Sequence, residues 1–490
     1  MTRALMLQGT GSDVGKSVLV AGLCRLATRR GLRVAPFKPQ NMSNNAAVCA
    51  GGGEIGRAQA LQARAAGIEP VADLNPVLLK PESNTRAQVV VQGRALASSK
   101  AADYMAGRRN LLPAVLESFH RLADQHELVL VEGAGSPAEI NLRSGDIANM
   151  GFARAAGVPV CLIGDIDRGG VIASLVGTHN VMAAEDAAMV RGFLVNKFRG
   201  DPRLFDEGIT AIEQRTGWPC RGLIPWMTEA ARLPAEDAVV LELNDSSERA
   251  LRIVAPLLSR IANFDDADPL IQEPGVDFCW IAPGDPLPRD ADVVLLFGSK
   301  STLGELAFLR QQGWDHDLIA HARTGGRILG ICGGLQMLGV TVTDSCGSDG
   351  SPGSTEGLGL LDLHTTMHTD KTLARRKARC ALTGATIEAY EIHQGVSSGI
   401  DAARPMAWID DRPEGYRSAC GRIEGTYLHG IFSNDDFRRQ WLQRAGAATA
   451  STLAYEHRVD RALDRIADGL AEHVDFEALL RDAQPPGWTP

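Results

Sequence analysis

The sequence of 490 residues has no C-x-x-C pair, and its nine cysteines are an odd number scattered along the chain. A disulfide framework or a structural zinc site needs regularly spaced cysteines, so we expect a reduced, cytoplasmic protein without either. No apolar run approaches the ~20 residues that cross a bilayer. The segment Met1–Leu7 leads directly into a predicted strand, which leaves no room for a signal peptide. We therefore expect no membrane association.

An excess of basic residues is also missing. Lys and Arg number 50 against 59 Asp and Glu, which gives a net charge of −9 at pH 7. Nucleic acid is therefore not expected as a partner, because phosphate binding needs a basic face. The composition, with 44% hydrophobic and 22% charged residues, is that of an ordinary globular protein. The length predicts two or three domains but no oligomeric state.

Two series of short apolar runs alternate with helical patterns and predict two α/β domains. The first series lies in residues 1–232, where the pattern is typical of a parallel sheet covered on both faces. Its predicted strands are Ala4–Gln8, Arg33–Phe37, Leu128–Glu132, Val158–Ile163 and Phe193–Asn196.

An acidic, polar stretch at residues 233–249 is interpreted as a linker. The second α/β domain is predicted in residues 250–440, with a Gly- and Ser-rich surface loop at 345–356. Residues 441–490 are predicted to form a C-terminal helical extension. The strands predicted in the second domain are Leu251–Val254, Phe278–Ile281, Val293–Phe297, Ile328–Ile331 and Thr426–Leu428.

The first predicted strand runs into a glycine-rich loop, Gly9-Thr-Gly-Ser-Asp-Val-Gly-Lys-Ser17, which is followed by a helical pattern. Backbone N–H groups of such a loop and the helix N-terminus bind phosphates. We expect Thr10 and Gly15 to line the loop, Lys16 to reach the terminal phosphates of ATP, and the Ser17 hydroxyl to bind Mg²⁺. Thr10 stands where the usual pattern has its first glycine, and this variant loop resembles that of dethiobiotin synthetase and its relatives.

Three further polar residues lie at or after strand ends in the same domain. Glu132 ends a buried strand, where an ionised carboxylate needs a metal or a paired cation. We therefore predict it as a Mg²⁺ ligand, with a structural salt bridge as the alternative. Lys38 is expected to add a phosphate contact. Asn196 resembles the base-recognising asparagine of this superfamily. For both of these residues, simple solvation is the alternative.

The second domain contains a cysteine in Arg327-Ile-Leu-Gly-Ile-Cys-Gly-Gly-Leu-Gln-Met-Leu-Gly339. An apolar run, a cysteine, two glycines and a helical pattern predict a nucleophile elbow. A helix N-terminus favours a thiolate, and nearby N–H groups can face an oxyanion. The run Gly425–Phe432 includes His429, so Cys332 and His429 are the minimum set for thiol acyl transfer. A buried, unreactive Cys332 is the alternative.

These two contexts resemble class I glutamine amidotransferases, which release ammonia from glutamine through a cysteinyl thioester. The resemblance implies that Cys332 is the nucleophile and His429 its base, and that Gly298 and Gly333 belong to the oxyanion and glutamine site. Many members carry a glutamate two positions after the histidine, where this chain has Ile431. Either another group orients His429 or its activation is weaker.

Six longer strings are residues 37–45, 54–62, 75–81, 164–170, 390–395 and 425–432. They resemble the cobyric acid synthase family of cobalamin biosynthesis, and the resemblance covers nearly the whole chain. It implies ATP- and glutamine-dependent amidation of the b, d, e and g carboxylates of a corrinoid, adenosylcobyrinic acid a,c-diamide, through acyl phosphates. The cobyrinic acid a,c-diamide synthases share both domains and are the alternative family.

Other charged residues are given provisional places. Asp165, Asp167 and Arg168 follow a strand near the expected switch point of the sheet, and we assign them to the substrate or metal region. A loop network of Asp and Arg is the alternative. Glu54 is a second metal candidate, and His393 is either structural or part of an interface. Solvated charge is the alternative to a corrinoid-binding field for Lys80, Arg86, Arg94 and Lys100.

Two other classes of function share part of this pattern. A regulatory or partitioning ATPase has a similar phosphate loop, but it does not explain a second domain with both Cys332 and His429. A non-catalytic glutamine-binding module fused to a ligase would show no cysteine-dependent turnover. Glutaminase assays on the wild type and Cys332→Ser separate these alternatives.

Overall fold

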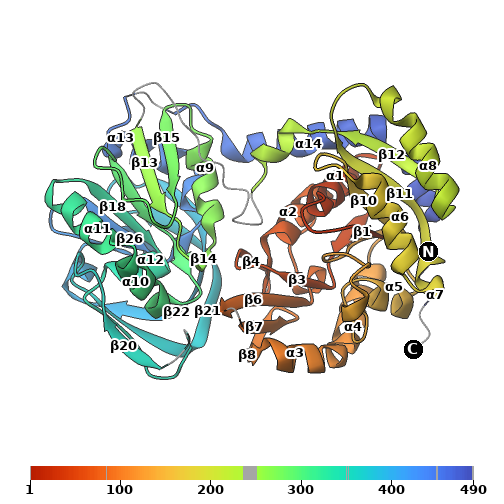
Figure 1. Cartoon of the computed structure of the whole chain (residues 1–490). Helices are drawn as coiled ribbons and strands as arrows, with labels where there is room; N and C mark the ends of the chain where they lie inside the picture. The colour runs from red at the N-terminus through yellow and green to blue at the C-terminus, as the bar shows by residue number, and fades with distance from the viewer. Residues whose placement is uncertain are drawn as a thin grey trace.

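The computed structural model describes residues 2–83, 85–234, 251–348, 350, 352–448 and 451–487. Apart from residues 233 and 234, the predicted linker lies outside them. Figure 1 shows two α/β halves side by side, and the C-terminal segment returns from the second half to the first along the helix α14 (Tyr455–His473). No helix in the described ranges is long and apolar enough to span a membrane.

A six-stranded, fully parallel sheet forms the centre of the first half. Its strands are β1 (Arg3–Gly9), β2 (Val34–Phe37), β9 (Leu128–Glu132), β10 (Val160–Asp165), β11 (Val190–Phe198) and β12 (Cys220–Pro225). The order β12-β11-β10-β1-β9-β2 places β1 between β10 and β9. The five predicted strands are confirmed. The sixth, β12, escapes prediction because it is a half-buried edge strand whose apolar run is weak.

Helices cover both faces of this sheet and create two cores. Leu5 and Leu7 point into the core that contains the helices α1 and α14, whereas Ala4 and Met6 point into the core on the other face. The helices of this half are α1 (Lys16–Arg29), α2 (Arg57–Ala66), α3 (Ala101–Gly107), α4 (Leu112–Ala123), α5 (Met150–Ala156), α6 (Val171–Val181), α7 (Ala184–Ala187) and α8 (Asp206–Thr216).

A smaller sheet that the sequence does not predict is inserted between β2 and α4. It contains β3 (Gln40–Met42), β6 (Val77–Ser83), β7 (Arg86–Val91) and β8 (Arg94–Lys100), and beside it lies the pair β4 (Ala46–Val48) and β5 (Glu54–Gly56). Gln92 and Gly93 turn β7 into β8 with φ values of 47° and 79°. Two-residue turns of this kind usually have the sequence Asn-Gly, so the Gln-Gly sequence here did not indicate a hairpin.

The second half is also α/β, as predicted. Its central sheet has the order β15-β13-β16-β18-β26-β25, and only the edge strand β25 is antiparallel. The strands are β13 (Leu251–Pro256), β15 (Val276–Ile281), β16 (Val293–Leu296), β18 (Arg327–Ile331), β25 (Tyr416–Arg417) and β26 (Ile423–Thr426). The accompanying helices are α9 (Asp268–Ile271), α10 (Thr302–Gln311), α11 (Trp314–Arg323) and α12 (Gly333–Leu338).

A second, mostly antiparallel sheet lies in the same half and is absent from the prediction. Its members are β19 (Thr341–Asp344), β20 (Gly353–Glu356), β21 (His364–Cys380), β22 (Thr386–Ser398), β23 (Ala407–Ile409), β24 (Arg412–Glu414) and β27 (Leu428–His429). A two-stranded ladder joins β14 (Ile261–Ala262) to β17 (Gly298–Ser299). The predicted strand Thr426–Leu428 is thus divided between two sheets, and β20 lies in the predicted loop.

The C-terminal segment forms α13 (Asp435–Ala445), α14 and α15 (Phe476–Asp482). The helix α14 packs on α1 of the first half, and a Cβ atom on Gly22 would lie only 2.6 Å from side-chain carbons of Ile466 and Leu470. Arg25 and Arg64 pair with Asp464 and Asp460 at this contact. The C-terminal extension therefore fastens the two halves together.

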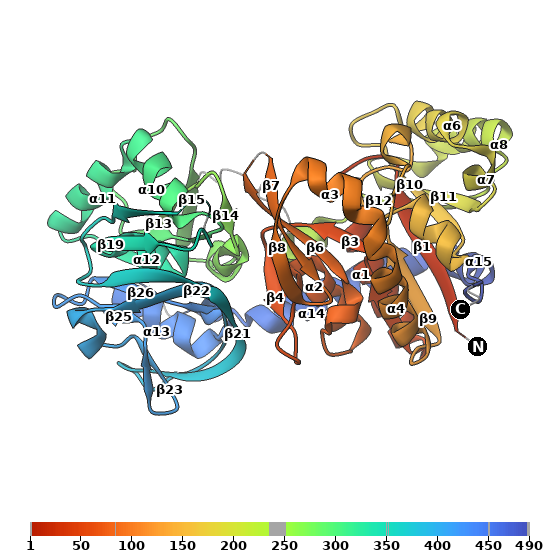
Figure 2. The ribbon, with the colours of Figure 1, turned by 90° about the horizontal axis from the view of Figure 1, so that it is seen from below.

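The halves also meet directly along β4, β21 and β22, as Figure 2 shows from below. Ala46, Val48, Leu78 and Val90 of the first half pack against Ile392 of the second in a small apolar cluster. Burial of apolar surface stabilises this contact. As a result, residues of the first half lie beside the cysteine-bearing half.

Candidate active site

The predicted nucleophile elbow is present at Cys332. This residue stands between β18 and α12 with φ 54° and ψ −109°, a conformation that non-glycine residues rarely adopt. Its N–H donates to the Thr426 carbonyl at 2.8 Å. A Cβ atom on Gly334 would lie 1.9 Å from the Leu296 carbonyl oxygen, so only glycine permits this close helix–strand packing. The surrounding structure thus holds the backbone of Cys332 in a strained turn.

The acid that orients His429 is Asp266. Its Oδ2 lies 2.7 Å from His429 Nδ1, and its Oδ1 accepts the Gly430 N–H at 2.5 Å. Both side chains are almost fully buried. Asp266 lies in the 3-10 turn Phe264–Ala267, 163 positions before the histidine. Asp266 therefore takes the place of the glutamate that many amidotransferases carry where this chain has Ile431, and it comes from a distant segment.

Asp266 also controls the charge of His429. Burial alone disfavours the imidazolium, but the carboxylate outweighs it and raises the pKa of His429 to about 10. With Nδ1 held by Asp266, Nε2 is the ring nitrogen that remains for the chemistry. A histidine that keeps its proton beside a cysteine favours a thiolate–imidazolium pair.

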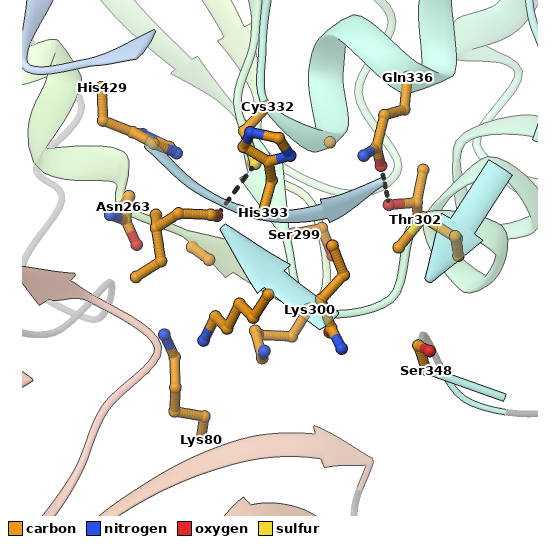
Figure 3. A pocket seen from close by; sticks show the side chains of 17 residues that line it. Lys80, Asn263, Ser299, Lys300, Thr302, Cys332, Gln336, Ser348, His393 and His429 are labelled. Carbon is orange, nitrogen blue, oxygen red and sulfur yellow. Dashed lines mark hydrogen bonds between the residues drawn. The ribbon is translucent and has the colours of Figure 1, made fainter. Parts of the chain in front are cut away.

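Cys332 and His429 line one pocket, shown in Figure 3. Gly298 and Gly333 line it as well. A Cβ atom on Gly298 would lie 3.5 Å from Cys332 Cβ and 3.6 Å from His429 Cε1, so the missing side chain keeps space between the two. The N–H of Gly333 belongs to the first turn of α12, where no intrahelical acceptor exists. Other polar residues that line the pocket are Lys80, Asn263, Ser299, Lys300, Thr302, Gln336, Ser348, Lys371, His393 and Gln394.

Lysines from both halves meet at the edge of this pocket. Lys80 of β6 and Lys371 of β21 donate to the two oxygens of the buried Glu54, at 2.9 and 2.5 Å. Their charge holds the pKa of Glu54 below its usual range despite burial, while burial and the neighbouring ammonium groups lower the pKa of Lys371 to about 7. Glu54 is therefore compensated by Lys80 of its own half and by Lys371 across the domain boundary, so both of its oxygens are paired without a metal ion.

The glycine-rich loop lies at the end of β1. Thr10 N–H donates to the Ile163 carbonyl at 2.9 Å, and Lys16 Nζ donates to the Gly11 carbonyl at 2.8 Å. Gly15 has φ 92°, and a Cβ atom there would lie 2.4 Å from Asn196 Nδ2. The shape of the loop therefore depends on this glycine. The Asn196 amide donates to the Val14 carbonyl at 2.8 Å and so supports the loop.

Glu132 lies beside the loop and is fully buried. Its Oε1 accepts hydrogen bonds from the Ser17 hydroxyl at 2.7 Å and Lys38 Nζ at 2.8 Å, and its Oε2 accepts one from the Gln62 amide at 2.6 Å. The salt bridge considered for Glu132 is thus present, with Lys38 as the partner. In this arrangement the Lys38 ammonium compensates a carboxylate next to the loop.

The residues present fit a magnesium ion held with nucleotide phosphates. Mg²⁺ in such sites is bound by one or two carboxylates or hydroxyls, water and phosphate oxygens, with no all-protein cage. The Ser17 hydroxyl and the Glu132 carboxylate already lie together. Within the described ranges, no group of three or more His, Cys, Asp or Glu side chains could hold a metal by itself. A cation at Ser17 and Glu132 would therefore depend on the phosphates of the nucleotide.

The three residues assigned to the substrate region lie next to the loop and form ion pairs. Asp165 pairs with Lys197 at 2.8 Å, and Lys197 also donates to the Asp13 carbonyl of the loop. Asp167 pairs with Arg199 at 2.7 Å. The more exposed Arg168 lies 3.9 Å from the Asp13 carboxylate. The structure thus places these residues at the phosphate loop, in a network of loop ion pairs.

The remaining sequence candidates have diverse surroundings. His393 stacks on Tyr427 with ring centroids 3.9 Å apart, and its Nδ1 lies 2.8 Å from the Gly395 carbonyl oxygen. It lines the pocket, so it belongs to the cysteine site as well as to the packing. Of the four basic residues considered for corrinoid binding, Lys80 lines this pocket. The other three, Arg86, Arg94 and Lys100, are exposed.

Sequence reasoning missed Asp266, Gln62 and Lys371. Gln62 lies in one of the strings that carry the family resemblance, but a glutamine in a helix has no chemical signature of its own. Asp266 belongs to a cluster with Asp265 and Asp268, all three of them buried. The acidic cluster itself was visible in the sequence, but acidic residues are almost always solvated, so the cluster gave no reason to expect burial.

Comparisons with known proteins agree with this arrangement. A CobQ/CobB/MinD/ParA nucleotide binding domain matches residues 5–240, and a CobB/CobQ-like glutamine amidotransferase domain matches residues 252–437. The cobyric acid synthase of Hyphomonas neptunium is 62% identical over 487 residues, which are 99% of this chain and 98% of that protein. The cobyric acid synthase of Paracoccus denitrificans is 63% identical over 97% of this chain and 99% of that protein.

A third relative, the cobyric acid synthase of Bradyrhizobium diazoefficiens, is 58% identical over 98% of this chain and 99% of that protein. Identity at this level along the whole length includes both the phosphate-loop half and the cysteine-bearing half. The chain therefore belongs to the cobyric acid synthase family and is a glutamine-dependent amidoligase.

Proposed function

We propose that this protein amidates the b, d, e and g carboxylates of adenosylcobyrinic acid a,c-diamide with ammonia from glutamine, using ATP. The product is adenosylcobyric acid. The observation that carries the proposal is the identity of 62% along 99% of the chain to a protein named cobyric acid synthase. The presence of a phosphate loop and a cysteine–histidine–aspartate triad in one chain supports it chemically.

The cysteine half supplies the nitrogen. The Cys332 thiolate attacks the side-chain amide carbon of glutamine, and N–H groups near Gly298 and Gly333 stabilise the oxyanion. The His429 imidazolium gives its proton to the departing nitrogen, so that ammonia leaves and a thioester remains. The neutral His429, oriented by Asp266, then takes a proton from the water that hydrolyses the thioester. Glutamate is released and Cys332 is restored.

The phosphate-loop half activates the acceptor. A carboxylate is a poor electrophile, so its oxygen first attacks the terminal phosphorus of ATP to give an acyl phosphate and ADP. Lys16 and the backbone of the loop position the phosphates. Mg²⁺, held by Ser17 and Glu132, would neutralise phosphate charge when bound. Ammonia then displaces phosphate from the acyl carbon, and the amide forms with loss of a proton.

Ammonia has to pass from one half to the other without escaping into water, where it would be protonated. The Cys332 pocket already includes Lys80 from the first half. We therefore expect ammonia to pass along the domain boundary. A passage closed to water would keep ammonia from being protonated on the way. In this proposal the first half serves both as the acceptor site and as part of the wall around the ammonia source.

The substrate is tested by incubating the protein with ATP, Mg²⁺, glutamine and each candidate corrinoid and following the product mass. Adenosylcobyrinic acid a,c-diamide is expected to gain four amides in succession. The runner-up, a,c-diamide synthesis, predicts conversion of cobyrinic acid. Turnover of cobyrinic acid but not of its a,c-diamide would overturn our choice of substrate.

Replacing Glu132 by glutamine should stop synthesis but spare glutamine hydrolysis. A metal contributes several kcal/mol to stabilisation of a charged transition state, and each 1.36 kcal/mol is a factor of ten, so we expect a loss of roughly 100-fold or more. The loss should be equal with glutamine and with ammonium. Glu127→Gln is the matched control, because Glu127 is half-exposed and pairs with Arg33. A synthetase that keeps its rate and Mg²⁺ dependence in Glu132→Gln would exclude this role.

A further inference from the structure

The turn that carries Asp266 is supported from the first half of the molecule. The adjacent residue, Asp265, is buried, with its side chain 3% exposed. Its Oδ2 lies 2.8 Å from Nε of Arg57, the first residue of α2 in the phosphate-loop half. The acid of the triad therefore lies one residue from an ion pair that crosses the domain boundary.

The Arg57–Asp265 ion pair compensates a negative charge that lies beside the carboxylate of the triad. Asp265 and Asp266 are neighbouring buried carboxylates, and two like charges at close range cannot both remain ionised without compensation. Burial raises the pKa of the Asp265 carboxyl, and the Arg57 guanidinium opposes this rise. Asp265 Oδ1 has no hydrogen-bond partner among the described residues. The charge of Asp265 thus depends on Arg57.

A second contact from the first half reaches the same turn. Asn263, just before it, donates through Nδ2 to the Ala46 carbonyl at 3.1 Å and to the Tyr390 hydroxyl at 2.8 Å. The Tyr390 ring stacks on the His429 ring, with centroids 5.2 Å apart and planes 18° apart. Asn263 therefore links the start of this turn both to Ala46 of the first half and to the tyrosine that stacks on His429.

The helix that presents Arg57 is fixed within its own domain. Gln62, five positions later on α2, donates to Glu132 Oε2 at 2.6 Å and to the Ser17 carbonyl at 3.2 Å. The N-terminal end of α2 thus meets the triad turn while its side chains reach the phosphate loop. Arg57 reaches Asp265 from a held helix, which is the condition for precise positioning.

We propose that Arg57 is a positioning residue of the glutaminase, supplied by the phosphate-loop half, and that the cysteine site is complete only when this guanidinium holds the Asp265–Asp266 turn. Arg57 acts through Asp265, Asp266 and His429 and touches neither Cys332 nor glutamine. The inference rests on the proposed glutaminase at Cys332. It adds that glutamine is hydrolysed efficiently only in the docked, two-domain enzyme.

The test measures glutaminase kcat and KM in the full chain for Arg57→Met and Arg57→Lys. We expect Arg57→Met to lower kcat by about 100-fold with little change in KM, because small displacements of catalytic groups reduce rates by that order. Arg57→Lys should recover most of the loss, since it restores the positive charge. Ammonium-supported synthesis should stay near the wild-type rate in both variants.

The matched control is Arg375→Met. Arg375 crosses the same boundary, donating to the Val48 carbonyl and to Glu69, but it does not contact the Asp265–Asp266 turn. It should keep wild-type kcat. Equal losses in Arg57→Met and Arg375→Met, or no loss in Arg57→Met, would overturn the positioning role. If Arg57→Met does not fold, Arg57→Gln is judged by the same criteria. A wild-type chain without cysteine-dependent glutaminase would instead refute the proposed function.

Discussion

Cys332→Ser is expected to lose glutamine-supported synthesis by at least about 10³-fold, because this histidine does not ionise a serine hydroxyl and removal of a nucleophile typically has effects of this size. Synthesis with added ammonium should be kept. The two outcomes follow from the separation of the halves. Cys332 belongs to the second half, whereas Lys16 and Glu132 lie at the phosphate loop of the first.

The measurement compares product formation with glutamine and with a saturating ammonium salt, together with glutamate release. Cys420→Ser is the matched control, because Cys420 is a free, exposed cysteine of the same half that does not line the pocket. It should behave as the wild type. If Cys332→Ser also lost its ammonium-supported activity, the model of two separable sites would fail.

Asp266→Asn is expected to lower the glutaminase kcat by about 10⁴-fold, the loss seen when the acid of a hydrolytic triad is replaced by its amide. The asparagine keeps the shape of the side chain but removes the charge that stabilises the imidazolium. It also offers an amide donor in place of an acceptor to one of its two partners, His429 Nδ1 or the Gly430 N–H.

The same variant should change the pH profile in a definite direction. In the wild type, Asp266 raises the pKa of His429 to about 10, so the histidine keeps its proton well above neutral pH. Without the carboxylate, burial prevails and the pKa of His429 falls. The alkaline limb of glutaminase activity should therefore move to lower pH.

The pH profile of kcat tests this shift, and Asp401→Asn serves as its control. Asp401 is also buried in the second half, where it pairs with Arg404, but it does not line the pocket. Its replacement should leave the alkaline limb in place. An unmoved limb in Asp266→Asn would mean that another group sets the charge of His429.

Features built from contiguous residues were accessible to prediction. The elbow at Cys332 is a strand, a turn and a helix in direct succession, and the Gly9–Ser17 loop has the same layout. The inner strands of both central sheets are apolar runs because they are covered on both faces. Short or half-exposed strands have no such signal, which is why β12, the β6–β8 sheet and the long hairpin of β21 and β22 were missed.

Side-chain partners could not be predicted in the same way. Glu54 and Glu132 are both buried acids, but one meets two lysines at the domain boundary and the other meets a hydroxyl and Lys38 at the phosphate loop. Burial of a carboxylate demands a partner without specifying which one. Only the packing of segments far apart in the chain selects it.

Local motifs were enough to predict that this protein combines a phosphate loop with a reactive cysteine and histidine, because the chemistry of each motif follows from neighbouring residues. The packing of distant segments made Asp266 the partner of His429, across 163 positions, and brought Lys80 of the first half to the Cys332 pocket and Arg57 to the Asp265–Asp266 turn. Hydrogen bonds and ion pairs act over a few ångströms in space, and distance along the chain carries no information about them.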